Sequence, residues 1–336
     1  MEVIVVEKVV AIGPFNPNMC AALTAAIPKD RFQLVFAGEE PEYQQIRDAD
    51  YIILRTLRID RDHMRYLEKA KLIQRWGAGF DTVDIEEAGR RGIQVAVTAG
   101  MNAVPVAELA LSLALAVYRN LVPLTSDIMN GRWSREAYSR RSYTIAGKTV
   151  GIYGMGNIGR KVAGLYKAFG AEVIYYDPYP LRPEQERQMG ITPVPQEQLW
   201  QKSDIVTLHA PLTQETRRVV GEAALAQMKD HAVLVNTARE ELVDYQAVAA
   251  AIRSGKLLGA GFDAIESSFI DNNPFSGMDN VVLTPHLGGN VVDIAGSMAA
   301  RCGEQILAVS RGKRLEPPHL VNGRYLKTDD KYAKRR

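Results

Sequence analysis

A glycine-rich turn limits the possible folds of this 336-residue chain more than any other part of its sequence. An apolar, β-branched run beginning at Thr149 ends in the pattern Gly-x-Gly-x-x-Gly, formed by Gly154, Gly156 and Gly159. Gly154 permits a tight turn, Gly156 lets the backbone approach a pyrophosphate, and Gly159 lets the following helix pack closely. The N-terminus of that helix would face the negative charge, so the motif predicts a dinucleotide site.

The segments after the glycines make this prediction specific. A helical pattern runs from Arg160 to Phe169, and a second apolar run, Glu172–Tyr176, ends in Asp177. A strand, a turn, a helix and a second strand with an acid about 20 residues downstream are typical of a dinucleotide-binding unit. Asp177 is expected to accept hydrogen bonds from the adenosine ribose and to repel a 2′-phosphate, which favours NAD over NADP. The alternative is an aspartate that only caps the turn before Pro178.

Composition argues against several other classes of protein. A net charge of +2 gives no electrostatic case for binding nucleic acid. The longest apolar stretch, Val106–Tyr118, is interrupted by Glu108 and Ser112 and falls short of the ~20 residues that span a bilayer, so no membrane segment is expected. Cys20 and Cys302 lack the spacing of a metal site, and both are expected to be reduced thiols in a cytoplasmic protein.

Alternating apolar runs and helical patterns predict an α/β protein with two domains. The runs after residue 148 are Thr149–Gly154, Glu172–Asp177, Asp204–His209, Ala232–Ala238, Leu258–Asp263 and Val281–His286. They predict a doubly wound parallel sheet of the Rossmann type, which would bind NAD. The runs in the first hundred residues are Val3–Ile12, Phe32–Ala37, Tyr51–Leu54, Leu72–Arg75 and Val95–Thr98. With helical patterns between them, such as His63–Ala70, they predict a smaller, flavodoxin-like domain.

Two further helices bear on how the domains are organised. A long apolar helix is expected over Asn102–Asn120, buried between domains or between the subunits of a homodimer. A later helix, Ala295–Ser310, is expected to return to the first domain. The predicted NAD-binding domain, 101–289, is then inserted into a discontinuous substrate domain, 1–100 and 290–336.

Unusual polar residues fall at the carboxyl ends of the predicted strands, where open α/β sheets bind ligands. Hydride transfer to a ketone creates an alkoxide, and histidine is a suitable proton donor near neutral pH. Of the five histidines, His209 and His286 end predicted strands, and His286 is the stronger candidate because glycines follow it. Arg239 could bind the carboxylate and carbonyl of a 2-keto acid. The alternatives are core histidines and, for Arg239, an ion pair with Glu240 or Glu241.

Taken in order, these motifs resemble the D-isomer-specific 2-hydroxyacid dehydrogenase family over nearly the whole chain. The matching segments are Gly154–Gly159, His209–Leu212, Asn236–Asp244, Gly261–Asp263 and Pro285–Gly289. The resemblance implies that Arg239 binds the keto acid, that His286 donates the proton and that Asp263 holds the nicotinamide carboxamide. It implies NAD contacts from Gly154, Gly156, Asn157, Ile158, Gly159, Asp177, His209, Ala210, Pro211, Thr216, Thr237, Ala238, Arg239, Asp263, His286 and Gly288.

The resemblance extends to two loops of the first domain. Gly77, Ala78 and Gly79 match the loop whose backbone amides cradle the substrate carboxylate. Arg55 and Arg58 match a loop over the active site, and Arg58 replaces a small polar residue. Either Arg58 recognises a second anionic or polyhydroxy group of the substrate, or it is a solvated surface arginine.

Two departures from the family pattern concern catalysis. Glu240 follows Arg239 where the family has glycine, and Ser268 stands where the family has a glutamate that pairs with the histidine. Glu266 lies two residues earlier. Glu266 could take the role from a shifted loop, another polar residue could take it, or the catalyst is weakened. The main hypothesis is a dehydrogenase for an unspecified 2-keto acid, and the alternative is an NAD-binding regulatory protein with weak or lost turnover.

Overall fold

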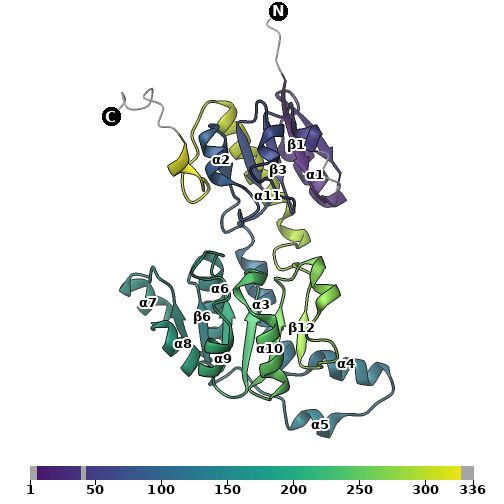
Figure 1. The fold of residues 1–336 in the computed structure, drawn as a ribbon, viewed down its shortest axis with the longest axis vertical. Coiled ribbons are helices and arrows are strands. Elements are labelled where there is room, and N and C mark those ends of the chain that lie inside the picture. Colours follow the sequence, from purple (N-terminus) through teal and green to yellow (C-terminus); the bar gives the residue numbers. More distant parts are fainter. Residues whose placement is uncertain (1–5, 39–42, 327–336) are drawn as a thin grey trace, which may run out of the picture. The chain divides into compact units, whose positions relative to one another are not determined.

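The computed structural model describes residues 6–38 and 43–326 and is drawn in Figure 1. Contacts within the chain divide it into two compact units. Unit 1 contains residues 1–102 and 291–336, and unit 2 contains residues 103–290.

Unit 1 is built on a five-stranded parallel sheet in the order β2-β1-β3-β4-β5. Its strands are β1 (Glu7–Ile12), β2 (Phe32–Ala37), β3 (Tyr51–Leu54), β4 (Leu72–Arg75) and β5 (Gln94–Ala96). This is the flavodoxin-like strand order, as predicted. The first predicted strand starts at Val3, but residues 3–5 lie outside the described part of the chain.

The α-helices of unit 1 are α1 (Pro17–Ala26), α2 (Ile85–Arg90) and α11 (Ala295–Ser310). α11 packs against α1 so closely that a Cβ on Gly303 would lie 2.6 Å from the Ala26 carbonyl oxygen. The helix predicted over His63–Ala70 is wrong, because only a 3-10 turn forms there, His63–Tyr66. Asp60 Oδ1 accepts hydrogen bonds from the backbone N–H groups of Asp62 and His63, which favours a local turn over a helix.

Unit 2 is built on a seven-stranded sheet in the order β12-β11-β10-β9-β6-β7-β8, with every pairing parallel. Its strands are β6 (Thr149–Tyr153), β7 (Glu172–Tyr176), β8 (Thr192–Pro193), β9 (Ile205–Leu208), β10 (Ala232–Asn236), β11 (Leu257–Phe262) and β12 (Val281–Leu283). The chain order reverses between β6 and β9, which is where doubly wound sheets bind ligands. The predicted Rossmann sheet is therefore confirmed, with the short edge strand β8 in addition.

The α-helices of unit 2 are α3 (Ala103–Tyr118), α4 (Leu121–Met129), α5 (Arg135–Ser139), α6 (Asn157–Ala168), α7 (Pro183–Met189), α8 (Gln196–Lys202), α9 (Glu222–Gln227) and α10 (Tyr245–Arg253). α3 packs against α6, β10 and β11, and most of its apolar side chains are buried in the core of unit 2. The apolar composition of this helix is thus explained within its own unit. In the described part of the chain, no single helix is long and apolar enough to cross a membrane, although α3 and α4 pass that test as a pair bent by 62°.

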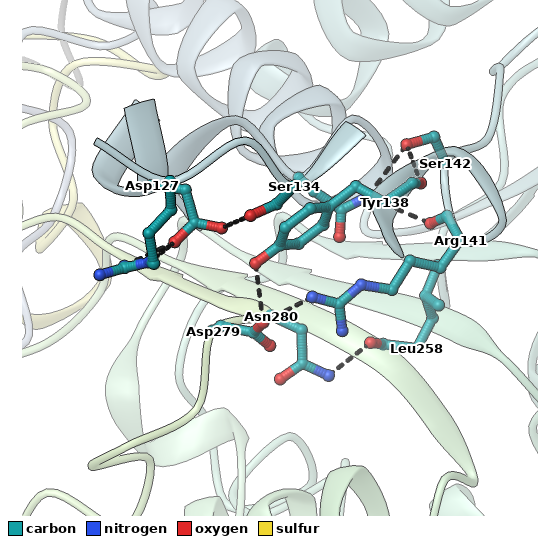
Figure 2. A network of polar contacts seen from close by, with 10 residues as sticks. Asp127, Ser134, Tyr138, Arg141, Ser142, Leu258, Asp279 and Asn280 are labelled. Atoms are coloured by element: carbon teal, nitrogen blue, oxygen red, sulfur yellow. Dashed lines mark hydrogen bonds and ion pairs between the residues drawn. The ribbon is translucent and has the colours of Figure 1, made fainter. Parts of the chain in front are cut away.

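Polar contacts hold the segment that carries α4 and α5 against unit 2 (Figure 2). Asp279, just before β12, accepts hydrogen bonds from Tyr138 Oη at 3.4 Å and from Arg141 Nη2 at 2.5 Å. Within the segment, Ser134 donates its hydroxyl to Asp127. The segment nevertheless leaves apolar side chains exposed at Leu121, Val122, Ile128, Met129 and Trp133.

Candidate active site

The glycine turn has the geometry that its sequence predicts. Gly154 adopts φ +99°, and a Cβ there would lie 2.7 Å from the backbone nitrogen of Ala210. A Cβ on Gly159 would lie 2.1 Å from the Gly154 carbonyl oxygen, so a side chain would force α6 away from the turn. Around Gly156, by contrast, a Cβ would meet nothing within 4 Å. The turn is closed on its protein side and open at Gly156.

These features fit a bound dinucleotide. The N-cap of the 12-residue helix α6 is Gly156, which has no side chain to occupy the helix N-terminus, so backbone N–H groups can face an anion. Asp177, at the end of β7, accepts hydrogen bonds from the backbone nitrogens of Met155 and Tyr179 at 2.7 and 2.8 Å. An ionised carboxylate has about four acceptor positions, so Asp177 can steady the glycine turn and still accept from ribose hydroxyls.

His209 lies at the end of β9, beside the glycine turn. Its Nε2 lies 2.8 Å from Thr207 Oγ1, and its Nδ1 lies 3.4 Å from Thr237 Oγ1 after β10. In the loop that follows, Thr216 donates its hydroxyl to the Pro211 carbonyl at 2.7 Å. Burial lowers the pKa of His209 to about 3, so this imidazole is neutral near pH 7.

The depressed pKa of His209 predicts a loss of stability in acid. The unfolded chain takes up a proton on this histidine near pH 6.5, whereas the folded protein does not until about pH 3. The free energy of unfolding therefore falls as the pH drops from 6.5. In urea denaturation, a His209→Gln variant should lose less stability than wild type between pH 7 and pH 5, by at most about 2 kcal/mol. Equal losses in the two proteins would contradict the prediction.

Arg239 follows β10, and buried Asn236 shapes the turn that presents it. Asn236 Oδ1 accepts from the Ala238 backbone nitrogen at 3.0 Å, and Asn236 Nδ2 donates to the Arg239 carbonyl at 2.8 Å. The half-buried Arg239 side chain donates from Nη1 to the Ala238 carbonyl at 2.6 Å. The backbone around the guanidinium is therefore fixed by a side chain that the sequence analysis did not single out.

His286 lies in a turn after β12 that the Asp263 carboxylate holds in place. Asp263, 1% exposed, accepts hydrogen bonds from the Thr284 hydroxyl at 2.6 Å and from the backbone nitrogens of Leu287 and Gly288 at 2.8 Å each. A Cβ on Gly288 would lie 2.8 Å from Asp263 Oδ2, so glycine is needed there. His286 itself adopts φ +53°, a left-handed conformation that is unfavourable for a histidine. The buried carboxylate thus maintains a strained backbone at the candidate proton donor.

Glu266 reaches this histidine. Its Oε1 lies 3.3 Å from His286 Nδ1, and both side chains are partly exposed to solvent. Glu266 is the N-cap of a 3-10 segment, Ser267–Asn272, which contains the exposed Ser268. The geometry thus pairs Glu266, rather than the residue two positions later, with His286.

The two candidate loops of unit 1 are linked by Arg75, at the end of β4. Its side chain, only 9% exposed, donates from Nε to the Gly79 carbonyl at 2.8 Å and also donates to the Arg55 carbonyl. Gly77 has φ +139° and open space where a Cβ would be, but its N–H donates to the Thr98 hydroxyl at 3.0 Å. The backbone N–H groups of Ala78 and Gly79 donate no backbone hydrogen bond within the described residues, so they are better placed than that of Gly77 to bind an anion.

Arg58 belongs to the same region of unit 1. Its side chain is exposed, and its carbonyl accepts a hydrogen bond from Tyr43 Oη at 2.7 Å. Asn236 and Thr284 in unit 2, and Arg75 in unit 1, each steady candidate residues of their own unit and were not expected from sequence. Asn236 and Thr284 lie close to Arg239 and His286 in the same sequence motifs, and this proximity was the only sequence feature that could have indicated their roles.

Comparison with known proteins identifies the family. Residues 111–288 match the model of the D-isomer specific 2-hydroxyacid dehydrogenase NAD binding domain, which is more than half of the chain. The chain belongs to the D-isomer-specific 2-hydroxyacid dehydrogenase family. It is therefore an NAD-dependent dehydrogenase, and its glycine turn and Asp177 lie within the matched NAD-binding domain.

Individual relatives agree with this assignment. The chain is 36% identical to a glyoxylate reductase of Thermococcus litoralis over 83% of this chain and 85% of that protein. It is also 36% identical to the D-3-phosphoglycerate dehydrogenase of Methanocaldococcus jannaschii over 84% of this chain, but spans about half, 54%, of that relative's length. The crystal structure of a glyoxylate reductase from Paecilomyes thermophila superposes with a TM-score of 0.81 at 28% identity, covering 94% of this chain and 99% of that one.

Proposed function

We propose that this dehydrogenase reduces a short 2-keto acid to the D-2-hydroxy acid, with Arg239 binding the keto acid and His286 donating the proton. The observation that carries the proposal is the His286–Glu266 pair at 3.3 Å, in a turn held by buried Asp263. A module that only bound NAD would have no need of an imidazole held in this way. His209 is a poor alternative donor, because burial keeps its imidazole neutral.

The proposed roles follow from the chemistry of reduction. Bound NADH supplies the hydride that is added to the carbonyl carbon. Arg239 offers a planar, always charged fork that holds the substrate carboxylate and polarises the carbonyl oxygen. Protonated His286 gives its proton to the oxygen as the C–O double bond becomes an alcohol. Glu266 accepts a hydrogen bond from Nδ1 of His286, which directs the Nε2 proton toward the substrate and stabilises the imidazolium. The reverse reaction needs neutral His286 as the base.

The substrate class is proposed to centre on small acids such as glyoxylate, in keeping with the glyoxylate reductases among the relatives. The test is oxidation of NADH, followed at 340 nm, with glyoxylate, pyruvate, hydroxypyruvate and longer 2-keto acids. Steady turnover of at least one of them is expected. If NADH binds but no 2-keto acid is reduced, the regulatory alternative replaces this proposal.

Arg58 is proposed to favour substrates with a second anionic group. Its guanidinium is exposed on the loop that also carries Arg55. An Arg58→Ala variant should raise the KM for a phosphorylated or dicarboxylic keto acid about three- to fivefold, the loss of one exposed charged contact, and leave the KM for glyoxylate unchanged. Equal KM values in variant and wild type for every acid would show that Arg58 is a solvated surface residue.

Location and assembly also stay proposals. The free thiols of Cys20 and Cys302 favour a reducing compartment such as the cytoplasm, which cell fractionation would check. A homodimer is also proposed. Helix α3 is buried mostly within unit 2, so it offers little surface to a second subunit. The segment that carries α4 exposes Met129 and Trp133 and is the better candidate for the dimer surface. A purely monomeric protein in sedimentation equilibrium at micromolar concentration would contradict the homodimer.

A further inference from the structure

The two departures from the family pattern meet in the structure. Glu240 stands where the family pattern has glycine, and Glu266 lies two residues before the position of the family's glutamate. Glu240 Oε2 accepts a hydrogen bond from the Glu266 backbone nitrogen at 3.2 Å, and Glu266 Oε1 lies 3.3 Å from His286 Nδ1. A continuous line of contacts therefore joins Glu240 to the histidine.

We propose that Glu240 is a positioning residue, whose carboxylate holds Glu266 where it can orient His286. The inference rests on the proposed function, because Glu266 matters to turnover only if His286 exchanges the proton. In this interpretation the two departures compensate one another. The extra side chain after Arg239 secures a glutamate that is displaced along the chain.

Glu266 needs such an anchor because its side chain is 68% exposed and that of His286 is 43% exposed. An exposed ion pair is screened by water and gains little from two mobile side chains, so its geometry depends on the backbone beneath it. Within the 3-10 segment, buried Phe269 packs edge-on against Tyr245 at 5.4 Å between ring centroids. Glu240 holds the backbone at Glu266 itself, three residues before Phe269.

The surroundings of Glu240 disfavour the ionised form of its carboxylate. Burial raises the pKa of Glu240, as do the charges of Glu241 and Glu266, while the Glu266 N–H lowers it. On the neighbouring helix α10, burial and the charge of Glu240 raise the pKa of Tyr245. The hydrogen bond from the Glu266 N–H is the contact that favours the Glu240 carboxylate. A glutamine has the same shape and a neutral acceptor oxygen, so it could accept the same hydrogen bond without the charge.

Three substitutions separate the anchor from the charge. Glu240→Ala removes the acceptor, and Glu240→Gln keeps an acceptor oxygen but removes the charge. Glu241→Ala is the matched control, because it removes the same charge from the adjacent, exposed position. Glu266→Ala and the double variant with Glu240→Ala complete a cycle in the full-length protein.

The kinetic readout uses NADH with the 2-keto acid that wild type reduces best. Glu240→Ala should lower kcat about tenfold with KM within about twofold of wild type, and Glu240→Gln and Glu241→Ala should stay within about twofold in both. The double variant should match Glu266→Ala, because a residue that acts only through Glu266 has no further effect once Glu266 is gone. The kcat–pH profile of Glu240→Ala should shift in the same direction as that of Glu266→Ala.

A second measurement does not depend on turnover. Hydrogen exchange at the Glu266 amide should be faster in Glu240→Ala than in wild type, and close to wild type in Glu240→Gln. If wild type turns over the acid but Glu240→Ala keeps its kcat and pH profile, or if the two losses multiply in the double variant, the inference is overturned and the proposed function stands. If wild type reduces no 2-keto acid, the proposed function fails, whatever the exchange rates show.

Discussion

An Arg239→Met variant is expected to reduce a 2-keto acid with a kcat/KM about 10³-fold below that of wild type, with a much smaller effect on the Kd for NADH. The guanidinium is half-buried on a turn fixed by Asn236, so its direction is set before substrate binds. Methionine keeps an unbranched stem about as long as the aliphatic part of arginine and removes both the charge and the paired donors. The substrate carboxylate would then be left without its ionic partner.

Two further variants test whether the loss of activity is specific to the guanidinium of Arg239. Arg239→Lys keeps the charge but not the planar fork, so it should recover only part of the activity. Arg217→Met makes the same change at an exposed arginine of unit 2 and should behave as wild type. An Arg239→Met enzyme within about tenfold of wild type would remove this residue from substrate binding, since loss of a buried charged contact costs more than that.

A His286→Asn variant is expected to lower kcat for reduction by 10²- to 10⁴-fold, roughly the contribution of a general acid. Asparagine is the appropriate replacement because it tolerates the left-handed conformation, φ +53°, that this position requires. Because reduction requires the acid form of the proton donor and oxidation requires its base form, wild-type reduction should slow as the pH rises and oxidation of the hydroxy acid should speed up. The variant should lose both dependences, which steady-state rates between pH 5 and 9 would show.

The matched control is His231→Asn. His231 is also exposed and also adopts a left-handed conformation, at φ +61°, so the substitution carries the same backbone preference. It should leave kcat and its pH profile unchanged. If His286→Asn keeps both pH dependences, the proton comes from another group and the proposed mechanism is wrong.

Much of the fold could be predicted because periodic apolar runs are a local property of the sequence. Six of the seven strands of unit 2 and the helix Ala295–Ser310 were predicted close to their observed bounds, and the short edge strand β8 was not predicted. The helix over His63–Ala70 was wrong because hydrogen bonds from Asp60 compete with helical ones. α4 and α5 were not predicted, since much of the apolar surface of that segment faces solvent and gives no clear periodicity.

The NAD-binding sheet, the glycine turn and the polar residues at the strand ends could be predicted from sequence, because each depends on local spacing along the chain. Which carboxylate lies beside His286 depends on contacts that form only in the folded protein. Glu266 reaches the histidine from 20 residues away, and Glu240 reaches Glu266 from 26 residues away. Such contacts depend on how loops after β10, β11 and β12 converge at one edge of the sheet, and the spacing of residues along the chain does not encode those distances.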